Sequence, residues 1–126
     1  GWMNPRRELD YIRQKGITLM PLKEVIEKGP IAVAREAAGI AGKGTDSVYL
    51  TFDIDAIDGA YAPGTGVPAP GGMTSREAIA LIAELAKVGI GGMDLVEVSP
   101  PYDHDGITSR LAVQLILEAL AGNARR

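Results

Sequence analysis

The sequence contains no cysteine and a single histidine, His104, among its 126 residues. The absence of cysteine excludes a disulfide-stabilised scaffold, a thiolate zinc site and a thiol nucleophile. One histidine without any cysteine also excludes a zinc cluster built from these two residue types. Chemistry that depends on thiolate ligands or on several histidines of this chain is therefore excluded.

The chain also lacks an excess of positive charge and a long apolar run. Lys and Arg number 13, and Asp and Glu number 16, which gives a net charge of −3. This balance argues against a nucleic acid or an anionic membrane as partner, because both need a dense Lys/Arg surface. No apolar stretch approaches the ~20 residues of a membrane span, and Arg6, Arg7 and Glu8 stand where a signal peptide would be apolar. We therefore expect a cytoplasmic protein.

The residues that are present indicate an α/β fold with a parallel sheet. Apolar, β-branched runs predict strands, and helically spaced stretches between Pro, Gly or Thr boundaries predict helices. Their alternation is typical of a parallel sheet covered by helices. Three strands are few for such a sheet, and the chain begins with Gly1 rather than Met, so we expect a segment of a larger domain. The expected strands are 17–20, 47–55 and 92–98, and the expected helices are 5–15, 22–29, 31–41, 75–88 and 107–121.

The strand expected over 47–55 ends in two aspartates, Asp53 and Asp55. Their spacing predicts that both carboxylates lie on one face of the strand, at the end of the sheet where α/β proteins bind ligands. Neighbouring carboxylates repel each other unless a cation lies between them or one is protonated, and Mn²⁺ or Mg²⁺ prefers such oxygen ligands. The alternative is a pair of solvated aspartates that cap amides of the long Pro/Gly loop at 56–73. Spacing alone leaves both interpretations open and favours the second.

A further carboxylate, Glu97, stands alone in the apolar run of the strand expected over 92–98. A buried Glu needs a partner, and a planar guanidinium suits it through two parallel hydrogen bonds. That guanidinium belongs either to a ligand or to an internal arginine such as Arg110, and spacing alone favours the arginine. Asp94 is a candidate to support a ligand residue by accepting a hydrogen bond. His104 is interpreted as a surface loop residue rather than a metal ligand.

Two stretches together resemble the ureohydrolase family of arginases, agmatinases and related guanidino hydrolases. They are TFDIDAIDGAYAPGTGVPAPGG at 51–72 and GMDLVEVSPPYDHDGIT at 92–108. The first resembles the family's signature of Asp-x-Asp, Asp and a Pro-Gly-Thr-Gly loop, and the second resembles its Asp-x-Val-Glu-Val segment in the agmatinase-like form. The resemblance implies a three-layer α/β/α fold with a central parallel sheet, of which residues 1–126 would form the carboxy-terminal portion.

The same resemblance implies an activity, a cofactor and roles for individual residues. Members of the family hydrolyse a guanidino compound, such as agmatine, to urea and an amine, at a binuclear manganese centre that activates a hydroxide. Their complete enzymes are commonly homotrimers or hexamers. Asp53 resembles the carboxylate that bridges both metals, and Asp55 resembles the ligand of one metal. Glu97 resembles the residue that pairs with the substrate guanidinium, and Thr65 and Gly66 resemble part of the wall of the active-site mouth.

Two departures from the family pattern change what we expect of this chain. Gly59 stands where the family usually has Pro, although Asp58 before it is present. The family's Gly-Gly-Asp-His and Asp-x-His-x-Asp segments, which carry its other metal ligands, do not occur here, so we expect the chain alone to be catalytically inactive. The alternative functions are a non-catalytic α/β assembly module and, less favoured, a phosphohydrolase of the haloacid-dehalogenase type. In that type the Asp-x-Asp motif is followed by Thr or Val, where Ala56 stands here.

Overall fold

The computed structural model describes residues 5–124. Two helices come first, and from residue 30 onward helices and strands alternate in the order that is typical of βαβ units. Short 3₁₀ turns at Ile54–Ala56, Ala86–Val88, Pro100–Tyr102 and His104–Gly106 join some of these elements. The helices and strands are α1 (Arg6–Gln14), α2 (Leu22–Lys28), α3 (Pro30–Ala41), β1 (Val48–Asp53), α4 (Ser75–Leu85), β2 (Ile90–Val96) and α5 (Ile107–Ala124).

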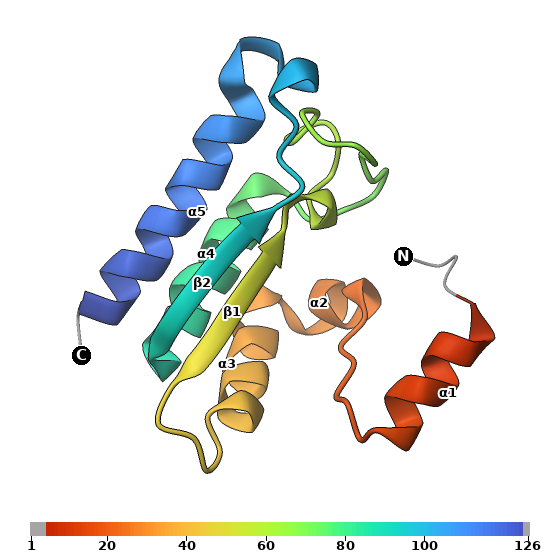
Figure 1. Cartoon of the computed structure of the whole chain (residues 1–126), viewed down its shortest axis with the longest axis vertical. Helices are drawn as coiled ribbons and strands as arrows, with labels where there is room; N and C mark the ends of the chain where they lie inside the picture. Colours follow the sequence, from red (N-terminus) through yellow and green to blue (C-terminus); the bar gives the residue numbers. More distant parts are fainter. Residues whose placement is uncertain (1–4, 125–126) are drawn as a thin grey trace.

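Strands β1 and β2 pair in parallel, with a register that runs from Val48 beside Ile90 to Asp53 beside Val96. The connection between them contains α4, which is the crossover that a parallel pair needs. The carboxyl ends of both strands therefore lie at the same end of the sheet. The loops that follow the two strands meet there (Figure 1), and a bridge between Thr65 and Val98 joins them.

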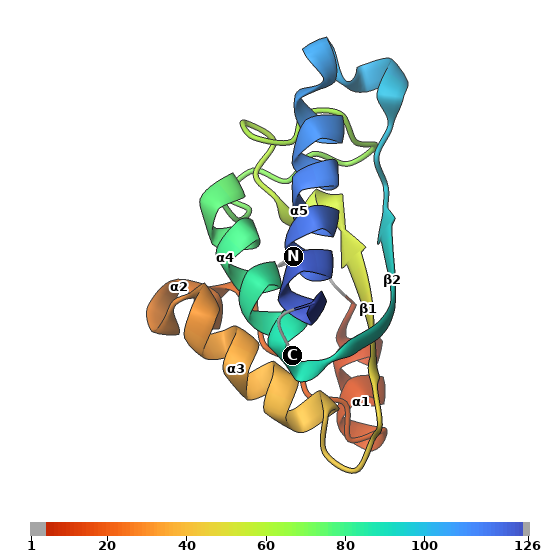
Figure 2. The same cartoon turned by 90° about the vertical axis from the view of Figure 1, so that its left-hand side faces the viewer.

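Helices α3, α4 and α5 lie together on one face of the sheet (Figure 2). Along β1, Phe52 is buried against this face, whereas Tyr49 and Thr51 are exposed on the other. The strand therefore alternates between an inner, more buried face and an outer, exposed face. Helix α1 lies apart from these layers (Figure 1) and contributes no buried residue. The predicted α/β class with a parallel sheet is confirmed for the described residues.

The extent of the sheet differs from the sequence expectation. Residues 17–20, expected as a strand, form an irregular connection in which Ile17 and Leu19 are half exposed. An apolar run becomes a strand only where another strand pairs with it, and no strand of residues 5–124 lies beside this one. The described sheet therefore has two strands rather than the expected three. The strand expected over 47–55 ends at Asp53, and the one expected over 92–98 lies at Ile90–Val96.

The helix boundaries follow the sequence more closely than the strands do. Thr74 caps α4, because the Glu77 N–H donates to Thr74 Oγ1 (3.2 Å) and the Thr74 N–H donates to Glu77 Oε2 (2.8 Å). This reciprocal pair satisfies two N–H groups that a helix start otherwise leaves unpaired. Helix α5 begins at the predicted residue and continues to Ala124. No helix in the part of the chain described here is long and apolar enough to cross a membrane.

Candidate functional site

Asp53 and Asp55 lie at the carboxyl end of β1. The prediction that both carboxylates lie on one face of the strand is wrong, because the strand does not extend to Asp55. Asp53 is the last residue of β1, and Asp55 lies in the 3₁₀ turn Ile54–Ala56 that follows. The strand ends here because the Asp53 carboxylate accepts the Asp55 N–H at Oδ1 (2.9 Å), which turns the backbone. Asp53 is exposed and Asp55 is half-buried.

Thr65 connects Asp55 to the loop that follows the other strand. Its side chain is 3% exposed, and its hydroxyl donates a hydrogen bond to Asp55 Oδ1. Its backbone forms an antiparallel bridge with Val98, while the Ser99 N–H donates to the Gly64 carbonyl oxygen (2.8 Å). The neighbouring Gly66 is exposed. The Gly64–Thr65 segment therefore lies between the aspartates and the residues that directly follow Glu97.

Glu97 lies one residue beyond the end of β2 rather than inside a strand. It is exposed, and its backbone has a left-handed φ of 68°. Among residues 5–124 its carboxylate forms no hydrogen bond or ion pair, so the expected salt bridge with Arg110 is not formed. A left-handed φ is uncommon for a residue other than glycine and persists only where the surroundings hold it. Here the bridge at Val98 holds the backbone immediately after Glu97.

Asp58 organises the long loop after β1. Its Oδ1 accepts the Ala60 N–H (2.8 Å) and its Oδ2 accepts the Gly71 N–H (2.6 Å), so one carboxylate spans both ends of the loop. These N–H donors lower the pKa of the Asp58 carboxyl below its ordinary value. The loop of residues 56–73 is thus closed by its own aspartate.

The sequence interpretation missed two residues that hold the second loop, Asp103 and Thr108. The Asp103 carboxylate accepts the Thr108 N–H at Oδ1 and the Ser109 N–H at Oδ2, both at 2.8 Å, in the first turn of α5. Thr108 is fully buried, and its hydroxyl accepts the Gly64 N–H (2.7 Å). The available signal was an aspartate a few residues before Thr and Ser at a helix start, which is the pattern of a helix cap.

The Asp103 carboxylate is expected to stabilise the folded state by an amount that depends on pH. The Ser109 hydroxyl and the two N–H groups lower the pKa of the Asp103 carboxyl from 3.8 to about 2. A pKa that is lower in the folded state stabilises the fold above the unfolded pKa, and this contribution is lost as the pH falls through the folded pKa. We expect Asp103→Asn to lower the melting temperature at pH 7, and the difference from the wild type to shrink between about pH 4 and pH 2. Melting curves across this range check it, and a pH-independent difference would contradict it.

The donor set at the end of β1 fits part of a divalent-cation site. Each of Asp53 and Asp55 has one hydrogen-bonded oxygen, Oδ1, whereas no residue of 5–124 donates to Oδ2 of either carboxylate. Anionic oxygens are the ligands that Mn²⁺ and Mg²⁺ prefer. No group of three or more His, Asp or Glu residues in the described part of the chain could hold a metal ion. These residues therefore offer two carboxylate ligands but not a complete coordination sphere.

The other candidates from the sequence lie outside this donor set. His104 is exposed at the start of a 3₁₀ turn, which agrees with its interpretation as a surface residue. Asp94 accepts hydrogen bonds from the hydroxyls of Tyr49 (2.8 Å) and Thr51, so it joins the two strands on the exposed face of the sheet. These hydroxyls lower the pKa of Asp94. Asp94 therefore supports the pairing of β1 with β2, and the donors that it accepts from are these two hydroxyls.

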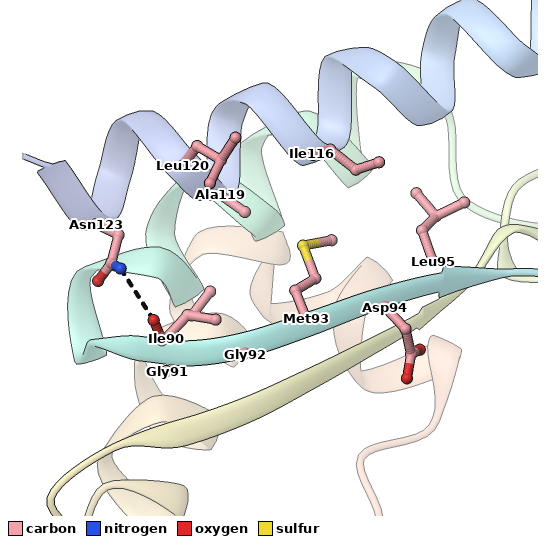
Figure 3. Close-up of a pocket in the computed structure, with 10 residues that line it drawn as sticks. All are labelled: Ile90, Gly91, Gly92, Met93, Asp94, Leu95, Ile116, Ala119, Leu120 and Asn123. Carbon is pink, nitrogen blue, oxygen red and sulfur yellow. Dashed lines mark hydrogen bonds between the residues drawn. The ribbon is translucent and has the colours of Figure 1, made fainter.

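A cavity of about 360 Å³ lies between β2 and the carboxy-terminal half of α5 (Figure 3). Met93 and Leu95 point into it from the strand, whereas Asp94 points away. At one end, the Asn123 side chain donates to the Ile90 carbonyl oxygen (2.9 Å). The lining is mainly apolar and contains none of Asp53, Asp55 and Glu97. This cavity is therefore separate from the carboxylates at the strand ends.

The amino-acid sequence is similar to that of known proteins of one family. The sequence pattern of the arginase family matches residues 2–122. The chain is 44% identical over 124 residues to a proclavaminate amidinohydrolase of Streptomyces clavuligerus, which covers 97% of this chain and 39% of the relative. It is 44% identical over 111 residues to an agmatinase of Enterobacter sp. (strain 638), which covers 88% of this chain and 36% of the relative.

A solved structure agrees with the sequence comparison. The crystal structure of Trypanosoma cruzi formiminoglutamase with Mn²⁺ superposes with a TM-score of 0.90 at 28% identity, covering 100% of this chain and 43% of that chain. The chain thus spans about two fifths of the length of the proteins that it matches. The match runs through both loops at the strand ends, and the resemblance expected from the sequence is confirmed: the chain belongs to the arginase family.

Proposed function

We propose that this chain supplies two metal-binding carboxylates, Asp53 and Asp55, and a guanidinium acceptor, Glu97, to an arginase-family hydrolase. The observation that supports this most directly is the meeting of the two loops. Thr65 bonds to Asp55 through its hydroxyl and to Val98 through its backbone, directly beside Glu97. A metal ion and a guanidinium bound to these side chains would therefore be neighbours.

The reaction class follows from the relatives. An amidinohydrolase and an agmatinase are among them, and a guanidino compound is the shared substrate chemistry. In such a hydrolysis, the oxygen of water bonds to the guanidino carbon and the carbon–nitrogen bond to the substrate chain breaks. The leaving nitrogen takes both protons of the water, so a guanidinium gives urea and an ammonium group. A bound metal supplies the activation of water at neutral pH.

Glu97 would orient the substrate in this reaction. Its carboxylate is exposed and has no partner within residues 5–124, so its oxygens remain free to accept parallel N–H bonds from a planar guanidinium. Asp53 and Asp55 would hold manganese, the metal bound in the formiminoglutamase structure. For the complete protein we further propose a cytoplasmic homo-oligomer, a trimer or hexamer, that acts on a small guanidino substrate such as agmatine.

The described residues offer too few ligands for a binuclear centre, because no group of three or more His, Asp or Glu side chains among them could hold a metal ion. We therefore propose that the 126-residue chain binds Mn²⁺ weakly and releases no urea from agmatine. A urea assay with added Mn²⁺ checks the second statement. Sustained turnover by the chain alone would contradict it.

The test of the site itself is a Mn²⁺ titration of the chain, read from the electron paramagnetic resonance signal of hydrated Mn²⁺. We expect Asp53→Asn together with Asp55→Asn to weaken binding by about tenfold or more, because neutral amides replace two anionic ligands. Asp46→Asn is the control, since it makes one such Asp-to-Asn change at an exposed residue before β1. Equal binding by the wild type and the double variant would overturn the proposed site.

A further inference from the structure

Thr65 makes a contact that a residue in the wall of an active-site mouth does not need. Its hydroxyl is directed inward to the Asp55 carboxylate, and its side chain is 3% exposed. A hydroxyl that binds substrate has to face the open side of the site. The inward hydrogen bond therefore indicates a different task for this side chain.

The hydrogen bond selects which oxygen of Asp55 remains available. Oδ1 is occupied by the Thr65 hydroxyl, and Oδ2 receives no donor from residues 5–124. The Asp53 carboxylate likewise has one occupied oxygen, because its Oδ1 accepts the Asp55 N–H (2.9 Å). One oxygen of each carboxylate is thus held by the protein, which fixes the direction in which the other oxygen points.

Thr65 itself is held from three sides. Its backbone bridges to Val98, and the adjacent Gly64 binds both the Ser99 N–H through its carbonyl oxygen and the Thr108 hydroxyl through its N–H. The Thr108 hydroxyl is buried, so the chain position of Thr65 is set by the start of α5 and by the loop after β2. A hydroxyl on so constrained a backbone can orient a carboxylate with little loss of its own freedom.

We infer that Thr65 is a positioning residue that fixes the Asp55 carboxylate for a divalent cation, and that it does not bind substrate. The inference rests on the proposed function, since it concerns the same metal site. Thr65 would thus support a metal-binding side chain, Asp55, instead of forming the wall of the active-site mouth. Residues that orient metal ligands commonly change the affinity for the metal by about 10–100-fold when they are removed.

The test compares three variants of the full 126-residue chain by the same Mn²⁺ titration. Thr65→Val keeps the shape but removes the donor, and we expect its Mn²⁺ dissociation constant to rise about tenfold. Thr65→Ser keeps the donor and should stay within about twofold of the wild type. Thr51→Val removes a hydroxyl that donates to another carboxylate, Asp94, and should bind Mn²⁺ as the wild type does.

The possible failures can be told apart. If the wild type binds no Mn²⁺ through Asp53 and Asp55, the proposed function and this inference both fail. If the wild type binds through them and Thr65→Val binds equally well, only this inference fails. Weak binding by Thr65→Ser as well as Thr65→Val would assign the effect to packing and would also overturn it. Circular dichroism of each variant verifies that the fold is retained.

Discussion

Replacing Leu115 with alanine is expected to lower the free energy of unfolding by about 2–5 kcal/mol. Leu115 is fully buried on α5 and belongs to the apolar core together with Ile82 of α4 and Phe52 of β1. The shortened side chain loses its transfer free energy and leaves a cavity that the packed layers fill only in part. Urea unfolding followed by circular dichroism measures the change.

Leu117 provides the matched control on the same helix. Its side chain is 52% exposed, so Leu117→Ala should change the free energy of unfolding by less than about 0.5 kcal/mol. The contrast between the two leucines measures which side of α5 faces the sheet. Equal losses for Leu115→Ala and Leu117→Ala would contradict the packing of α5 against α4 and β2.

Gly64→Ala is expected to disrupt the contact between the two loops and to lower the free energy of unfolding by about 1–3 kcal/mol or more. An added Cβ at Gly64 would lie 2.5 Å from Asp103 Cβ and 2.7 Å from Asp103 Cα. Because these atoms belong to the main chain or are fixed to it, the loops can accept the methyl group only by moving apart. Such movement would stretch the hydrogen bond from the Gly64 N–H to Thr108.

Gly66→Ala is the control for this effect. It lies two residues further along the same loop, and an added Cβ there meets no atom within 4 Å. Neither glycine has a positive φ, so the comparison isolates the space available and not the backbone conformation. We expect Gly66→Ala to remain within about 0.5 kcal/mol of the wild type in the same urea experiment. An equally small effect of Gly64→Ala would contradict the close approach of the loops.

The elements that could be predicted from the sequence are those whose cause is local. The alternation in β1 follows from the period of an extended strand, and the start of α4 follows from the Thr74–Glu77 capping pair. The family resemblance was equally accessible, because its motifs are contiguous in the chain. The carboxylates at the strand ends lie at the same end of the sheet for a general reason, since parallel strands end together.

The features that were predicted wrongly depend on partners distant in sequence. The apolar run at 17–20 carries a strand pattern but has no neighbouring strand within residues 5–124. Glu97 was expected inside a strand, whereas pairing of β2 with β1 ends at Val96. The Thr108 hydroxyl accepts the N–H of Gly64, which lies 44 residues earlier in the chain. No periodicity or spacing rule encodes such contacts.

The anchoring of α5 has a consequence for how the molecule opens. Helix ends usually fray on their own, because their first N–H groups have no partner within the helix. In α5 the N–H groups of Thr108 and Ser109 are held by Asp103, and the hydroxyl of Thr108 holds the loop that carries Thr65. The helix start and the carboxylate end of the sheet must therefore come apart in one cooperative event, rather than as two independent local fluctuations.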